Sequence, residues 1–258
     1  MLLAIDVGNT ETVVGLFEGE ELVAHWRLAT VRERTYDEYR VFFEHLLRVD
    51  GFGTADISGA SISSVVPTAT TAVRRLAVAM VGGPTVVVEP GIRTGMGILI
   101  DNPREVGADR VANSIAALTR YGAPAIVVDF GTSTNFDVVN SDGNYVGGSI
   151  APGLEVSLEA LIAATAALRK VELEPPRSVV GKGTVEAIQS GLLYGHAALV
   201  DGMVDRISAE LEAEPAVVAT GGLASTIVPH CRLVDTVDEF LTLEGLRLVY
   251  ERNIEGGG

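Results

Sequence analysis

The sequence predicts an α/β fold made of two copies of a β-β-β-α-β-α unit, with a ligand cleft between the halves. Two observations carry this prediction. An Asp-x-Gly motif follows a short apolar run at Asp6 and again at Asp129, about half the chain later. Each copy is followed by a strand-like run, a turn and another strand-like run, as in a β-meander. We place the halves at 1–113 and 114–258, joined inside a helix near Asn113.

The elements of the first half follow from short apolar runs and from helical spacing. Apolar or β-branched runs bounded by polar turns predict strands over residues 2–5, 12–17, 22–28, 57–66 and 85–88. The segment Glu18 to Glu20 predicts a hairpin turn. Apolar residues at helical spacing predict helices over 36–49 and 70–81.

The second half repeats this order. Apolar runs predict strands over 125–128 and 134–139, a turn at 141–144, and a third strand that begins at Tyr145. A later β-rich run ends in the pair Gly221-Gly222, which precedes a helix. Paired glycines allow a flat ligand such as adenine to lie against bare backbone, although a strand-to-helix turn without a ligand explains them better in isolation.

Composition bounds the classes of function. The 258 residues are 47% hydrophobic, which is enough for a packed core, and no apolar run approaches the roughly 18 residues that cross a bilayer. The net charge of −15 argues against a nucleic-acid or anionic-membrane partner, since phosphate backbones are held by clustered Lys and Arg. Cys231 is the single cysteine, which suits a reducing compartment. We expect a cytoplasmic protein.

The repeated motif suits a nucleotide phosphate. The carboxylate of Asp6 or Asp129 can hold a hydrated cation, the following glycine lets the backbone approach a phosphate, and the hydroxyls after it donate hydrogen bonds. One copy is only weakly indicative, because hairpins use Asp and Gly for turn geometry alone. Two copies at equivalent positions favour a phosphate site.

A further candidate site precedes the helix that joins the halves. Val111, Ile115 and Leu118 lie at helical spacing, which places Asp109 and Arg110 in the first turns of this helix. An Asp and an Arg there can be purely structural. Phosphoryl transfer to an alcohol, however, needs a carboxylate that orients and deprotonates the hydroxyl, and an anionic acceptor needs a cation.

Other site types are excluded. The run Gly181 to Thr184 lacks the earlier glycine and the hydroxyl directly after Lys182 that a Walker loop requires, and no Gly-x-Gly-x-x-Gly occurs. The spacing of the four histidines is not that of metal ligands. These residues are His25, His45, His196 and His230.

The two phosphate motifs and the glycine pair together resemble those of the superfamily that contains actin, sugar kinases, acetate kinase and the heat-shock ATPases. This resemblance implies duplicated actin-like, or ribonuclease H-like, domains with a nucleotide cleft between them. Longer motifs resemble type III pantothenate kinase over positions 2 to about 250. These motifs lie at residues 6–10, 101–110, 129–132, 147–154, 177–191 and 220–222. The resemblance implies transfer of the ATP γ-phosphoryl group to the primary hydroxyl of pantothenate, which yields 4'-phosphopantothenate in the first step of coenzyme A biosynthesis.

The resemblance also implies a role for each matching position. The residues expected to hold Mg-ATP are Asp6, Val7, Gly8, Asn9, Thr10, Gly131, Thr132, Gly221 and Gly222, with magnesium bound to Asp6 through water. Asp129 is expected to bind a monovalent cation, potassium or ammonium. The acceptor is expected at Gly107, Ala108, Asp109, Arg110 and Thr184, with Asp109 as general base. A homodimer is implied, because the acceptor pocket of this family forms partly at a dimer interface.

Two positions depart from the family pattern. Glu11 stands where a neutral polar residue is expected, and Asn135 replaces a more usual Thr or small residue. A carboxylate near phosphates repels them unless a cation intervenes or strand alternation turns it away. Two alternative functions stay open: a non-catalytic nucleotide-binding regulator, against which Asp109 weighs, and a kinase of another small alcohol, which the motif 107–110 disfavours.

Overall fold

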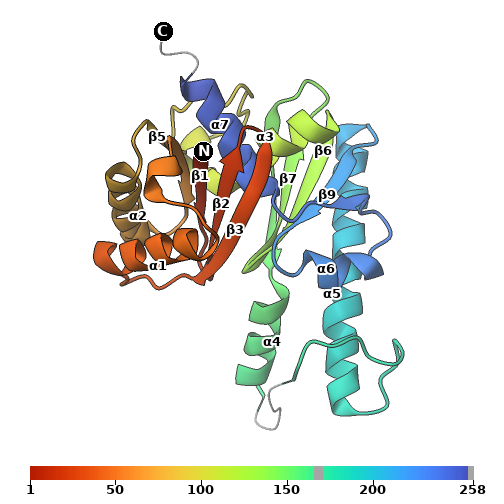
Figure 1. Ribbon diagram of the computed structural model, residues 1–258. Coiled ribbons are helices and arrows are strands. Elements are labelled where there is room, and N and C mark those ends of the chain that lie inside the picture. Colours follow the sequence, from red (N-terminus) through yellow and green to blue (C-terminus); the bar gives the residue numbers. More distant parts are fainter. Residues whose placement is uncertain (166–170, 255–258) are drawn as a thin grey trace. The chain divides into compact units, whose positions relative to one another are not determined.

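A computed structural model of the chain describes residues 1–165 and 171–254 (Figure 1). Contacts divide the chain into two compact units, of which the first comprises Met1–Thr119 with Phe240–Gly258 and the second comprises Arg120–Glu239. The division into halves at 1–113 and 114–258 concerns duplication rather than contacts, and it stays a prediction.

The first unit is built on a five-stranded sheet in the order β3-β2-β1-β4-β5. Its strands are β1 (Leu2–Val7), β2 (Glu11–Glu18), β3 (Glu21–Ala29), β4 (Gly59–Ser64) and β5 (Thr85–Val87). The first three form an antiparallel meander, and β4 and β5 add to it in parallel. This meander is the one that the short apolar runs and the turns between them predict.

Helices cover both faces of this sheet. The helices of the first unit are α1 (Tyr36–Val49), α2 (Pro67–Met80), α3 (Ala108–Tyr121, which ends in the second unit) and α7 (Leu241–Ile254), with 3₁₀ turns at Thr54–Asp56 and Pro103–Glu105. Helices α1 and α2 bury their apolar stripes against one face, where Ile5, Val14 and Ile62 form part of the core. Helix α7 packs on the opposite face. It comes so close that a Cβ on Gly59 would lie 1.8 Å from the Tyr250 hydroxyl, so this strand position requires glycine.

The second unit contains a five-stranded sheet in the order β10-β9-β6-β7-β8. Its strands are β6 (Ala125–Phe130), β7 (Ser133–Val139), β8 (Tyr145–Pro152), β9 (Ala216–Thr220) and β10 (Thr236–Val237). The pairs β6–β7 and β7–β8 are antiparallel, whereas β9 runs parallel to β6. The antiparallel meander and the parallel fourth strand repeat the arrangement of the first unit.

The helices of the second unit are α4 (Leu154–Ala163), α5 (Thr184–Leu211) and α6 (Ala224–Ile227), followed by a 3₁₀ turn at Val228–His230. Leu193, Ala197 and Val200 of α5 belong to the core over β6 and β9, while the first half of α5 extends past the sheet beside α4 (Figure 1). None of the helices in the two described ranges is both long and apolar enough to cross a membrane.

The main differences from the predicted elements lie at their ends. Helix α2 begins at Pro67, three residues before its predicted start, because proline suits the first turn of a helix. Strands β1 and β6 continue through Asp6 and Asp129 to Val7 and Phe130. Both aspartates therefore lie within the sheets, with neighbours defined by strand register.

Candidate active site

The first phosphate motif begins with Asp6 on the central strand of its sheet. Asp6 pairs with Val13 of β2 on one side and with Ser63 of β4 on the other. The Ser63 hydroxyl donates a hydrogen bond of 2.5 Å to Asp6 Oδ1. Because Ser63 is fully buried, this bond holds the carboxylate in one orientation at the end of the sheet.

A tight turn follows Asp6. The Gly8 N–H donates to the Glu11 carbonyl at 2.9 Å, and a Cβ on Gly8 would lie 3.0 Å from that oxygen. Asn9 and Thr10 are exposed at the tip, and the Thr30 N–H donates to the Thr10 carbonyl at 2.8 Å. The turn thus presents a polar tip of the kind that binds phosphate through backbone and hydroxyl groups.

Glu11 does not stand as an isolated negative charge beside this turn. Arg27 of β3 forms an ion pair with it, at 3.1 Å between Arg27 Nη1 and Glu11 Oε2. Glu11 pairs in register with Ala29, two residues from Arg27, so both side chains lie on one face of the sheet. The prediction left the direction of Glu11 open, and the structure provides a cation for it.

The second phosphate motif repeats the geometry of the first. Asp129 lies on β6 between Asn135 of β7 and Thr220 of β9. The following turn is closed by the Gly131 N–H, which donates to the Ser133 carbonyl at 3.0 Å. The Asn135 amide oxygen accepts from the Ser133 hydroxyl at 2.9 Å, so this departure from the family pattern adds a neutral, anchored side chain.

Two glycines outside the second motif allow other segments to approach it. A Cβ on Gly153, just before α4, would lie 2.4 Å from the Thr132 carbonyl oxygen. A Cβ on Gly221 would lie 2.6 Å from Asp129 Oδ1, and Gly221 has a positive φ of 91°, which disfavours any other residue. The structure therefore brings the predicted adenosine motif directly against the predicted cation ligand. Gly222 is exposed and has open space where a Cβ would be.

The candidate base lies in the first turn of α3. Asp109 is partly buried, and its Oδ1 accepts a hydrogen bond from the Arg110 backbone N–H at 2.9 Å. A Cβ on Gly107 would lie only 2.5 Å from the same oxygen, so the carboxylate rests directly on the Gly107 backbone. Burial raises the pKa of the Asp109 carboxyl above its ordinary value, against the opposing effects of the Arg110 N–H and charge. The site therefore holds a carboxylate with increased proton affinity.

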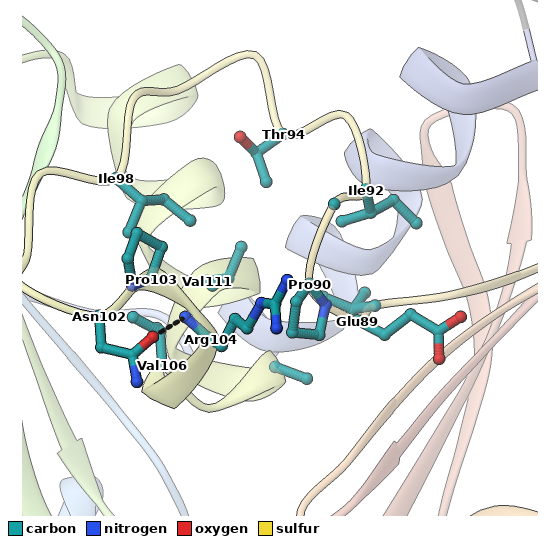
Figure 2. A pocket seen from close by; sticks show the side chains of 13 residues that line it. Glu89, Pro90, Ile92, Thr94, Ile98, Asn102, Pro103, Arg104, Val106 and Val111 are labelled. Atoms are coloured by element: carbon teal, nitrogen blue, oxygen red, sulfur yellow. Dashed lines mark hydrogen bonds between the residues drawn. The ribbon is translucent and has the colours of Figure 1, made fainter.

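A cavity of about 390 Å³ lies beside this helix start (Figure 2). Its wall is mainly apolar and is formed by Val88, Glu89, Pro90, Gly91, Ile92, Thr94, Ile98, Asn102, Pro103, Arg104, Val106, Ala108 and Val111. Ala108 belongs to the wall but Asp109 does not. The cavity thus backs the segment that carries the carboxylate.

The loop that contributes Ile92 and Thr94 to the cavity wall is held against α7 by hydrogen bonds. The Asn253 side-chain amide donates to the Arg93 carbonyl at 2.9 Å and accepts from the Arg93 N–H at 3.2 Å. Arg252 donates to the Thr94 carbonyl and, at 3.4 Å, to the Thr119 hydroxyl on α3. The C-terminal helix thereby ties the loop before the acceptor motif to α3.

The remaining predicted acceptor residue, Thr184, is the exposed first residue of α5 in the second unit. The loop before it is fixed to the helix by an ion pair of 2.5 Å between Arg177 Nε and Glu186 Oε1. Three apolar side chains around Thr184 are exposed, at 67% for Val179, 79% for Val180 and 54% for Val185. Large exposed apolar residues in one place are typical of a protein interface.

No three His, Cys, Asp or Glu side chains within residues 1–165 and 171–254 gather as a ready-made metal centre. A nucleotide-borne magnesium ion takes one or two carboxylates and completes its shell with phosphate oxygens and water. The Asp6 carboxylate, oriented by Ser63, offers oxygen atoms of this type. The Asp129 carboxylate likewise offers oxygen atoms, the donor type that hard cations prefer.

Sequence reasoning missed residues that act through long-range pairing. Ser63 reaches Asp6 only because β4 pairs in parallel with β1. Its signal in the sequence is a hydroxyl near the end of a buried strand, which is weak by itself. Gly153 approaches Thr132 across the second motif, and nothing in the local pattern shows that contact.

Comparisons with known proteins agree with these observations. A family described as type III pantothenate kinase matches residues 2–206. The chain is 54% identical to the type III pantothenate kinase of Acidothermus cellulolyticus over 98% of this chain and 99% of that protein. It is 56% identical to the one from Frankia alni, over 98% of this chain and 100% of that protein. A solved structure of ROK hexokinase from Thermus thermophilus is similar with a TM-score of 0.52 at 15% identity, covering 97% of this chain and 99% of that one. The structural likeness confirms the duplicated actin-like fold.

Proposed function

The chain belongs to the type III pantothenate kinase family and phosphorylates pantothenate with ATP in coenzyme A biosynthesis, and we propose that Asp109 is the base of this reaction. One observation carries the proposal: the Asp109 carboxylate lies partly buried at the start of α3, and this burial raises its pKa. A carboxylate with a raised pKa accepts a proton from an alcohol more readily than a solvated one does. The Arg110 N–H and the Gly107 backbone fix its position.

The acceptor is held by the motif 107–110 and by Thr184 in this proposal. Arg110 supplies the positive charge that pantothenate, a carboxylate, requires. Asp109 orients the primary hydroxyl toward the γ-phosphorus and takes its proton as the new P–O bond forms, while the bond from the γ-phosphorus to the bridging oxygen breaks and ADP leaves. Phosphoryl transfer is mainly a matter of positioning and charge stabilisation, so the fixed carboxylate is the main catalytic contribution of the acceptor side.

ATP and a divalent metal follow from the kinase family. We assign the nucleotide phosphates to the tips of the two motifs, 8–10 and 131–132, and the adenosine to Gly221 and Gly222. Asp6 is proposed to hold magnesium through water, since Ser63 already orients its carboxylate. Asp129 is proposed to bind a monovalent cation, potassium or ammonium.

A homodimer is also proposed. The exposed cluster of Val179, Val180 and Val185 beside Thr184 supports it, because a partner that covered this cluster would also close the acceptor site at Thr184. The expected compartment is the cytoplasm. A charged substitution such as Val180→Asp is expected to shift the protein from dimer to monomer in analytical ultracentrifugation and to raise KM for pantothenate. A dimer that survives this change would contradict the placement of the interface.

The decisive experiment is pantothenate-dependent release of ADP from Mg-ATP by the wild type and by Asp109→Asn. We expect kcat to fall by a factor of about 10² or more in Asp109→Asn, because the general base is lost. Asp37→Asn is a matched control, since Asp37 is also an aspartate in the first turn of a helix but is exposed on α1. The assay is run with potassium and repeated with sodium in its place, and turnover that needs potassium would support the cation site.

The outcomes separate the proposal from its alternatives. A variant Asp109→Asn with nearly wild-type turnover would show that another group removes the proton. A wild-type protein that binds ATP without releasing ADP would favour a nucleotide-binding regulator. ADP release with another small alcohol but not with pantothenate would favour a different acceptor.

A further inference from the structure

The ion pair between Glu11 and Arg27 lies beside the first phosphate turn. Strand register places Asp6, Val13 and Arg27 in one row across β1, β2 and β3. Residues in such a row point to the same face of the sheet, and the outer two of three strands lie roughly 10 Å apart. Arg27 is therefore on the same face as the carboxylate that we assign to magnesium, at a distance that a long side chain and a polyphosphate together can span.

The ion pair with Glu11 directs the Arg27 guanidinium toward the phosphate turn. Its partner Glu11 is the first residue of β2 after the turn, two residues nearer the turn than Val13. Two residues further from the turn along β3, His25 stacks on Phe240 at 4.5 Å between ring centres, where the chain leads into α7. Phe240 therefore covers this face near His25, while at the end near the turn Arg27 and Glu11 keep 32% and 50% of their side-chain surfaces exposed.

The pair is suited to exchange. Ion pairs with this exposure contribute little stability, so breaking one costs little. A phosphate offers Arg27 a bidentate, charge-assisted contact in place of its single, partly exposed contact with Glu11. The ion pair also explains how Glu11 is compatible with a phosphate site. The Glu11 carboxylate by itself would repel a phosphate, but it holds the Arg27 guanidinium, which attracts one.

We propose that Arg27 is a binding residue for an ATP phosphate, held beside the turn by Glu11 and transferred to a phosphate oxygen when the nucleotide binds. The inference rests on the proposed role of 6–10 as a phosphate site. It does not depend on Asp109 as the base or on pantothenate as the acceptor.

The test is a double-mutant cycle on nucleotide binding. The dissociation constant of a non-hydrolysable Mg-ATP analogue is measured by calorimetry for the wild type, Arg27→Ala, Glu11→Gln and the double variant. We expect Arg27→Ala to weaken binding about tenfold or more even when residue 11 is Gln, as for a lost charge-assisted contact. Glu11→Gln alone should bind the analogue at least as tightly as the wild type.

A matched control is Arg40→Ala, which breaks an exposed ion pair of 2.7 Å with Glu44 on α1 and should leave nucleotide binding unchanged. Thermal melting confirms that each variant is folded. If the effect of Arg27→Ala disappears in the Glu11→Gln background, Arg27 merely neutralises Glu11 and the inference is wrong. A wild type that does not bind the analogue overturns it as well.

Failure of the proposed function would look different. A protein that binds the analogue with the expected Arg27 dependence but releases no ADP in the presence of pantothenate retains the phosphate contact and loses the kinase assignment. A protein with full pantothenate-dependent turnover, whose binding of the analogue does not depend on Arg27, retains the kinase assignment and loses the phosphate contact.

Discussion

The contact between Gly107 and Asp109 makes a small substitution informative. In Gly107→Ala the new Cβ would lie 2.5 Å from Asp109 Oδ1. Carbon–oxygen contacts do not normally fall below about 3.3 Å, so the carboxylate oxygen has to move by roughly 0.8 Å. A displacement near 1 Å in a reacting group costs up to about 10²-fold in rate, so we expect kcat/KM for pantothenate to fall between about tenfold and about 100-fold.

Folding should change far less than catalysis. Gly107 lies outside the left-handed region, and the atom that its Cβ meets is the end of a side chain that can rotate. Replacement of such a glycine by alanine stabilises the chain by about 0.4–1 kcal/mol through the unfolded state, which offsets part of the local strain. The KM for ATP should stay near the wild-type value.

The assay compares steady-state kinetics and melting temperature for the wild type, Gly107→Ala and Gly82→Ala. Gly82 is a control in the same unit, because a Cβ there meets nothing within 4 Å. Wild-type kcat/KM in a folded Gly107→Ala protein would refute the reasoning, since either the carboxylate does not rest on Gly107 or its position does not matter.

Three further predictions use the same site. Burial raises the pKa of Asp109, so the protonated form is favoured in the fold and the charged form lowers the free energy of unfolding. Asp109→Asn should therefore melt at a higher temperature than the wild type near pH 7, with a difference that vanishes at acidic pH, and an equal melting temperature at all pH values would contradict the burial argument. Gly221→Ala puts a Cβ 2.6 Å from Asp129 Oδ1 at a positive φ, so KM for ATP and the potassium requirement should both rise; a change in stability alone would count against a cation at Asp129. Asn253→Ala removes two hydrogen bonds to Arg93 and should lower the melting temperature by about 2–4 °C, corresponding to about 1 kcal/mol. The same change should raise KM for pantothenate more than KM for ATP. An unchanged KM for pantothenate would show that this wall of the cavity does not affect the acceptor site.

The parts of the fold that the sequence predicts well are those in which local pattern and tertiary environment agree. Strands β1 and β6 are short apolar runs in the sequence and are buried at nearly every position in the structure, and the turns of both meanders carry glycine where a positive φ is needed, as at Gly19 and Gly143. Helix α1 was expected over 36–49, and the structure has it at Tyr36–Val49, where Thr35 forms a capping box with Glu38.

The parts that could not be predicted depend on partners far along the chain. The sequence left the direction of Glu11 open, and only the register of β3 shows that Arg27 meets it. Helix α7 packs with the first unit because Gly15, Gly59 and Gly245 leave room for it, and these glycines lie far apart in the sequence. A pattern confined to neighbouring residues carries no information about such a fit.

The charge of the protein explains why single cations matter at its site. With 34 acidic and 19 basic residues, the chain as a whole repels polyphosphates. Screening at physiological salt limits this repulsion to about 8 Å, so what decides binding is the set of charges within that distance of the phosphates. In the proposed site, a metal ion and backbone N–H groups would supply much of the attraction, and Arg27 adds a positive charge to the face that carries Asp6. An acidic kinase of this kind therefore concentrates its affinity for nucleotide phosphates in a few positions. Loss of one cation there should weaken nucleotide binding more than it would in a basic nucleotide-binding protein.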